Sequence, residues 1–117
     1  MKRGEMDNIR RKDIVLLPYP FTDQEGTKVR PALVVSNDNF NRKSKDCILI
    51  PLTTVIKEEP YSIIMDNSNL ESGNLLKPSR IRVDKIFTIE RSLIIMKIGS
   101  VNNQTFDKIM SELNKIL

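Results

Sequence analysis

Residues 29–36 read Val-Arg-Pro-Ala-Leu-Val-Val-Ser, and residues 50–54 read Ile-Pro-Leu-Thr-Thr. Apolar and β-branched residues dominate both segments, which is typical of strands that contribute to a core. Because Pro31 has no backbone donor, we expect it at a sheet edge or at the beginning of its strand. Arg30 is then expected where a loop enters the sheet, and Thr53 where the next strand ends.

Short segments of strand length recur along the rest of the chain, separated by Gly, Asn, Ser, Asp or charged residues. Besides 29–35 and 47–54, the predicted strands are 13–17, 61–65, 75–83, 86–89 and 93–98. A proline closes the first of them, and the polar stretch 37–46 is expected to be a loop. Short, regularly spaced strands favour a mainly β fold, a twisted antiparallel sheet or small barrel.

From Asn102 the apolar period changes from two to that of a helix. Phe106, Ile109, Met110 and Leu113 follow at helical spacing. An asparagine side chain is a good N-cap, so Asn102 or Asn103 is expected to begin the helix. The sequence therefore predicts a β fold with one C-terminal helix.

The length of 117 residues fits one domain, which we place over residues 1–117. Residues 1–11 form a basic N-terminal extension whose composition allows it to be flexible. The first twelve residues lack an apolar core, and no run is long enough to span a bilayer, so we expect a cytoplasmic protein.

The chain contains no histidine. This excludes a catalytic His pair, a Ser-His-Asp triad and a His-containing zinc site. The single cysteine, Cys47, lies in an apolar run, where thiols usually behave as small hydrophobic groups, and we assign it no chemistry. No cofactor and no metal site are predicted.

Nineteen basic residues outnumber fifteen acidic ones, which gives a net charge of +4. Basic residues cluster near the N-terminus, around residues 42–45 and around residues 77–85. Arg80 and Arg82 lie two apart in a predicted strand, so their side chains share a face about 7 Å apart, comparable with successive phosphates. This arrangement indicates salt-sensitive binding to a nucleic acid strand, although solvated surface charge is the plainer interpretation of such clusters.

The segments 29–36 and 50–54, with 13–16 before them and 75–85 and the last sixteen residues after them, resemble the MazF/PemK family of type II toxins. The resemblance covers residues 11–117. It implies an SH3-like barrel of the MazF/CcdB type that forms a homodimer with a groove for single-stranded RNA. It also implies an endoribonuclease, or mRNA interferase, that cleaves RNA by attack of the RNA's own 2′-OH. Such an enzyme needs no metal, and its products carry a 2′,3′-cyclic phosphate and a 5′-OH.

By the same resemblance, Arg30 matches the family's catalytic arginine and Thr53 its catalytic hydroxyl residue, with Thr54 as a second candidate. A guanidinium can hold two phosphate oxygens and stabilise the charge of the transition state, and a hydroxyl can donate to phosphate or relay a proton. The candidate RNA-binding residues are Lys77, Arg80, Arg82, Asp84, Lys85 and Phe21, of which Phe21 could stack on a base. Phe87 departs from the pattern, because many ribonucleases of the family have a basic residue there.

Two other functions remain open from the sequence. One is a gyrase-inhibiting toxin of the same fold, as in CcdB-type proteins. The other is a catalytically silent module that binds RNA or an antitoxin. The resemblance implies a cognate antitoxin partner in every case, with an acidic segment that folds on binding.

Overall fold

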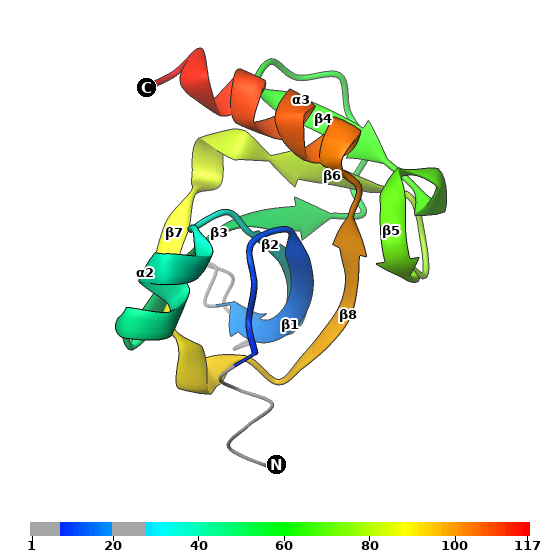
Figure 1. The fold of residues 1–117 in the computed structure, drawn as a ribbon. Coiled ribbons are helices and arrows are strands. Elements are labelled where there is room, and N and C mark those ends of the chain that lie inside the picture. The colour runs from blue at the N-terminus through cyan, green and yellow to red at the C-terminus, as the bar shows by residue number, and fades with distance from the viewer. Residues whose placement is uncertain (1–7, 20–27) are drawn as a thin grey trace.

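The fold is described from a computed structural model that covers residues 8–19 and 28–117 (Figure 1). The strands are β1 (Asp13–Tyr19), β2 (Lys28–Val34), β3 (Asp46–Thr53), β4 (Ser62–Met65), β5 (Leu70–Gly73), β6 (Ser79–Arg82), β7 (Phe87–Glu90) and β8 (Met96–Val101). The α-helices are α2 (Asp38–Lys43) and α3 (Asn103–Asn114), and the short 3-10 helices are η1 (Asn67–Asn69), η2 (Val83–Lys85) and η3 (Arg91–Leu93). Within the described residues, no helix is long and apolar enough to cross a membrane.

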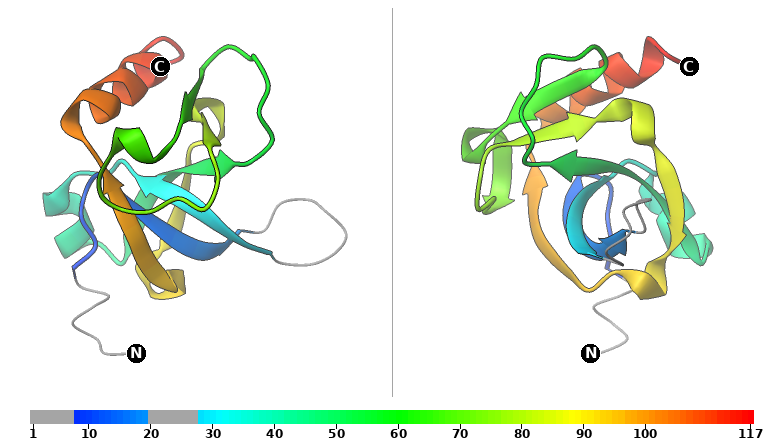
Figure 2. Two further views of the ribbon diagram at one scale, coloured as in Figure 1. Left: turned by 90° about the vertical axis from the view of Figure 1, so that its right-hand side faces the viewer. Right: turned by 180° about the vertical axis from the view of Figure 1, so that it is seen from behind.

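The strands pair antiparallel in the order β4-β6-β3-β2-β1-β8-β5. Strand β3 is long enough to serve two further partners, because β7 pairs with residues 46–49 and β6 with residues 52–53. The sheet curls on itself, and α3 lies across one end of it (Figures 1 and 2). The predicted mainly β, SH3-like barrel with a C-terminal helix is confirmed.

Both faces of the central strands are buried, because side chains alternate along each strand. Ile14, Leu33 and Ile50 belong to the cluster that the helix covers. Val15 and Ala32, which pair across β1 and β2, belong to a second cluster on the opposite face. Each central strand therefore reads as a continuous apolar run, which is the pattern in 29–35 and 47–52.

Helix α3 begins as its sequence predicts. The side chain of Asn102 accepts a hydrogen bond from the Thr105 amide at 2.8 Å and so caps the first turn. Phe106, Ile109 and Leu113 are buried against the sheet. The helix closes the first cluster and leaves the second face to the strands.

The prolines interrupt the strands less than predicted. β1 continues through Pro18, which pairs with Val29, rather than ending before it. Pro31 lies in the middle of β2, between β1 and β3, and not at an edge. The ladder to β3 begins only at Ala32, so the donor that Pro31 lacks falls outside that ladder.

The polar stretch 37–46 was wrongly predicted to be a loop. Its first residue, Asn37, accepts a hydrogen bond from the Phe40 amide and caps α2. Asn41 is buried and donates to the Ser36 carbonyl at 2.9 Å. Polar contacts rather than an apolar stripe hold this helix.

The segment 75–83 was predicted too long, because only Ser79–Arg82 forms a strand. The Leu75 amide donates to the Asn67 side chain at 2.6 Å instead of to a ladder, and Pro78 has no donor. Strand β5, which the sequence did not predict, pairs with β8.

Candidate active site

Strands β2 and β3 bring Arg30 and Thr53 to the same end of the sheet. Ala32 pairs with Pro51 in the antiparallel ladder. Arg30 lies two residues before Ala32, and Thr53 lies two residues after Pro51, so both lie just beyond the same end of this ladder. Because side chains alternate along a strand, both lie on the face of Ala32 and Pro51. Both side chains are half-buried, which leaves part of each open to solvent.

Strand β6 adds a third residue to this row, because Arg80 pairs directly with Thr53. The row Arg30–Thr53–Arg80 lies on the face that carries Ala32 and Leu49, which belong to the second cluster. This cluster is apolar along the middle of the strands and gives way to polar side chains at their ends. The candidate active site therefore lies at the edge of this apolar cluster, near the ends of β2, β3 and β6.

The Thr53 hydroxyl has a defined partner. Its oxygen accepts a hydrogen bond from the Val55 amide at 3.1 Å. A hydroxyl has one hydrogen to donate and two lone pairs, so this contact leaves the hydrogen available to another acceptor. Thr54, the second catalytic candidate, is exposed and follows the last residue of β3.

Arg80 is placed differently from an exposed phosphate contact, because its exposed fraction is 3 %. Its Nε donates to the Val55 carbonyl at 3.1 Å, and its Nη1 lies 3.5 Å from Glu59 Oε2. Both partners belong to residues 54–60, the loop after β3, which we call the β3–β4 loop. In this conformation the loop covers the guanidinium, and contact of Arg80 with RNA stays a prediction.

The other basic candidates surround the row. Arg82 is two residues from Arg80 on the same strand and donates from Nη2 to Asp84 Oδ2 at 2.9 Å. Lys85 is exposed at the end of η2, and Lys77 is exposed in the segment before β6, beside an open hollow of about 380 Å³. Phe21 lies outside the described residues. RNA contact by these residues also stays a prediction.

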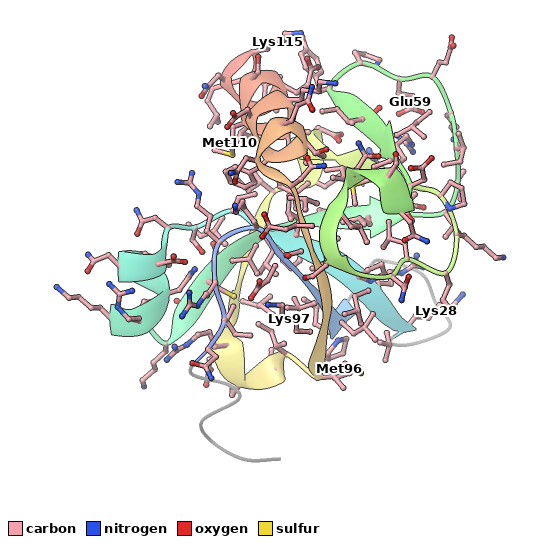
Figure 3. All side chains as sticks on the ribbon, turned by 45° about the vertical axis from the view of Figure 1, so that its right-hand side comes forward. Lys28, Glu59, Met96, Lys97, Met110 and Lys115 are labelled. Atoms are coloured by element: carbon pink, nitrogen blue, oxygen red, sulfur yellow. The ribbon has the colours of Figure 1, made fainter. Side chains whose placement is uncertain are left out.

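Sequence reasoning missed two residues of this region. Lys28 stands two residues before Arg30, so it shares the face of Arg30, and it is exposed at the start of β2. Glu59, on the β3–β4 loop, forms the ion pair with Arg80. Figure 3 labels both side chains. The even spacing of Lys28 and Arg30 was a usable signal, whereas nothing in the sequence connects residue 59 with residue 80.

Among residues 8–19 and 28–117, no group of three or more His, Cys, Asp or Glu side chains is arranged to hold a metal ion. Cys47 is buried, and burial raises the pKa of its thiol from 9.0 to about 11, against the weaker opposing effect of Arg91. At neutral pH the thiol is therefore protonated and a poor nucleophile.

The family model of the PemK-like, MazF-like toxins of type II toxin-antitoxin systems matches residues 10–117. This match spans nearly the whole chain. The chain belongs to the PemK/MazF toxin family. The family resemblance of the strands at 29–36 and 50–54 is thereby confirmed.

Solved structures agree with the PemK/MazF fold. An endoribonuclease from a mycobacterial species, in complex with its cognate antitoxin, has a TM-score of 0.74 and 23% identity over 92% of both chains. A MazE–MazF complex from Deinococcus radiodurans has a TM-score of 0.72 and 20% identity over 92% of this chain and 94% of that one. The Mycobacterium tuberculosis toxin MazF-mt6 has a TM-score of 0.68 and 17% identity over 86% of this chain and 93% of that one. No curated protein sequence matches the chain.

Proposed function

We propose that this chain is an endoribonuclease toxin that cleaves single-stranded RNA at a phosphodiester, with the adjacent 2′-OH as nucleophile and without a metal. The observation that carries the proposal is that Arg30 and Thr53 lie just beyond the same end of the β2–β3 ladder, on one face of the sheet. Membership of the PemK/MazF family, some of whose solved members are endoribonucleases, supports it.

The reaction forms one bond to phosphorus and breaks another. The 2′-OH gives up its proton to solvent as its oxygen bonds to phosphorus, the bond from phosphorus to the 5′-oxygen breaks, and the leaving oxygen takes up a proton, so that no proton is gained or lost overall. The products are a 2′,3′-cyclic phosphate and a 5′-OH. An internal nucleophile is already positioned, so the protein has to orient the phosphate and stabilise the charge that develops on its oxygens.

Arg30 and Thr53 can supply that stabilisation. The guanidinium keeps its charge at every physiological pH, so it acts as an electrostatic clamp on two phosphate oxygens and not as a base. The Thr53 hydroxyl, already accepting from the Val55 amide, donates its hydrogen to a non-bridging oxygen or to the leaving oxygen. Removing one such donor typically costs about 10²- to 10³-fold in rate.

The flanking basic side chains would hold the RNA on either side of the scissile phosphate. Lys28 extends the face of Arg30, while Lys77 and Lys85 stand exposed at the two ends of β6. Such contacts bind any sequence through the backbone. We propose that a cognate antitoxin with an acidic segment competes for these same side chains, and that the toxin acts as a homodimer.

The test is cleavage of an end-labelled, mixed-sequence RNA in excess EDTA. We expect discrete fragments whose 5′ ends accept phosphate from a kinase without prior phosphatase treatment. A substrate with a 2′-deoxy sugar at the cut position should stay intact. Arg30→Ala and Thr53→Val should cleave about 10²- to 10³-fold more slowly.

Thr88→Val is the matched control for the threonine change. Thr88 is exposed on β7 and outside the row, so its variant should cleave like the wild type. Intact RNA with the wild-type protein would refute the enzyme and direct the work to gyrase inhibition and antitoxin binding. Cleavage of the 2′-deoxy substrate would refute the proposed nucleophile.

A further inference from the structure

We infer that Arg80 is a positioning residue for Thr53: through the β3–β4 loop it fixes the direction in which the Thr53 hydroxyl donates. The inference rests on the proposed function, since it gives Arg80 a role in the same reaction. Direct contact of Arg80 with a phosphate, the expectation from the sequence, is the alternative that the tests below distinguish from it.

The contacts form a short chain from Arg80 to Thr53. Nε of Arg80 donates to the Val55 carbonyl at 3.1 Å, and the Val55 amide donates to the Thr53 hydroxyl oxygen at 3.1 Å. The two ends of this chain are neighbours as well, because Thr53 and Arg80 pair directly across β3 and β6. Thr53, Val55 and Arg80 therefore form one closed unit at the end of β3.

The contact with Val55 decides how Thr53 can act. A threonine hydroxyl that is free in solvent rotates among staggered positions. Here one lone pair is engaged by an amide, which restricts the rotor and leaves the hydrogen to point away from the loop. The arrangement suits donation to phosphate only while the backbone N–H of Val55 stays in place.

Arg80 bonds the next peptide group, through the Val55 carbonyl, and so restrains Val55 from its other side. Residues 54–60 are all exposed, and an exposed segment with few buried contacts opens at low free-energy cost. The guanidinium is nearly fully buried and bonds the loop twice, at Val55 near its start and at Glu59 near its end. One planar group with several donors in a fixed fork can make both bonds at once, which a lysine ammonium in the same place cannot.

The kinetic test compares Arg80→Met with the wild type, in the presence and absence of Thr53→Val. Methionine keeps much of the apolar stem, and Glu59, which is 40 % exposed in its side chain, can be hydrated after the change. We expect kcat to fall at least about 10-fold, but no further than in Thr53→Val, with KM unchanged. In the Thr53→Val background, Arg80→Met should cause no additional loss.

Two results would overturn the inference. An additional loss in the Thr53→Val background would show that Arg80 acts independently of Thr53. A raised KM together with a salt dependence of binding that is shallower by about 0.7 would show a direct phosphate contact. Arg80→Lys separates the effect of charge from that of geometry. If the forked guanidinium is required, this variant should be as slow as Arg80→Met. Recovery of the wild-type rate would show that charge alone is sufficient.

A second readout needs no catalysis. Hydrogen exchange of the Val55 amide, followed by NMR, should be at least about 10-fold faster in Arg80→Met, since the loop opens more often. Lys115→Met removes a surface cation at the end of α3 and serves as the charge-matched control, with unchanged exchange and activity. Unchanged protection of Val55 in Arg80→Met would refute the clamp. If the wild type cleaved no RNA, the proposed reaction would be refuted. Hydrogen exchange of the Val55 amide would still show whether Arg80 holds the loop.

Glu59→Gln keeps the test open if Arg80→Met does not fold. It leaves the bond to Val55 and weakens only the ion pair. We expect a smaller fall in kcat in the same direction and partial loss of Val55 protection. A wild-type kcat and wild-type protection in this variant would refute the part assigned to Glu59.

Discussion

The buried thiol of Cys47 makes the stability of the protein depend on pH in a calculable way. Burial raises its pKa from 9.0 to about 11 in the folded protein. The folded state therefore holds the proton more tightly than the unfolded chain. Stability from this group is fully present below pH 9.0 and is lost as the pH rises to about 11. A pKa difference of about 2 corresponds to about 3 kcal/mol.

The assay is urea unfolding followed by far-UV circular dichroism, because the chain contains no tryptophan for fluorescence. The free energy of unfolding is measured between pH 7 and pH 11 for the wild type and Cys47→Ala. Lysine and tyrosine titration affects both proteins alike, so only the difference between them reports Cys47. We expect the wild type to lose about 2 kcal/mol relative to the variant across this range. A pH-independent difference would refute the reasoning.

Three further outcomes follow from the structure. Gly73→Ala should lower the free energy of unfolding by at least about 2 kcal/mol, because φ is +81° and a Cβ would lie 2.1 Å from the Ile98 carbonyl oxygen. A smaller loss in urea unfolding would mean that β5 shifts easily. Asn102→Ala should cost about 1 kcal/mol through loss of the α3 cap, and Asn102→Asp should restore most of it in the same assay. Lys85→Ala should weaken RNA binding alike for all sequences and make the plot of log affinity against log salt concentration shallower by about 0.7; an unchanged slope would remove Lys85 from the RNA contacts.

The parts of the fold that sequence could predict are those held by apolar burial. Continuous apolar runs and β-branched residues indicate β1, β2 and β3, and the helical period from Asn102 indicates α3 together with its cap. Helix α2 was missed because Asp-Asn-Phe-Asn-Arg-Lys has no apolar stripe and depends on Asn37 and Asn41. Strand β5, Leu-Glu-Ser-Gly, was missed because backbone pairing with β8 holds it.

The sequence selected candidate residues for the site but did not predict how they are arranged. Resemblance selected Arg30 and Thr53, but only the register of β2 against β3 brings them to the same end of the ladder. A register is a long-range property, fixed by how the whole apolar pattern of one strand fits its neighbour. Glu59 and the Val55 peptide group could not be selected at all, because their importance comes from the path of a loop.

Arg80 and Arg82 show where strand periodicity stops being informative. Two residues apart on β6, they share a face, as alternation predicts. Their surroundings nevertheless differ, since the β3–β4 loop covers Arg80 while Arg82 pairs with the exposed Asp84. Alternation predicts which face of the sheet a side chain lies on, whereas the burial of that side chain depends on which loop or helix covers the face. A basic pair read from sequence as two phosphate contacts is therefore better treated as two separate hypotheses, one for contact and one for positioning, until the loop is known.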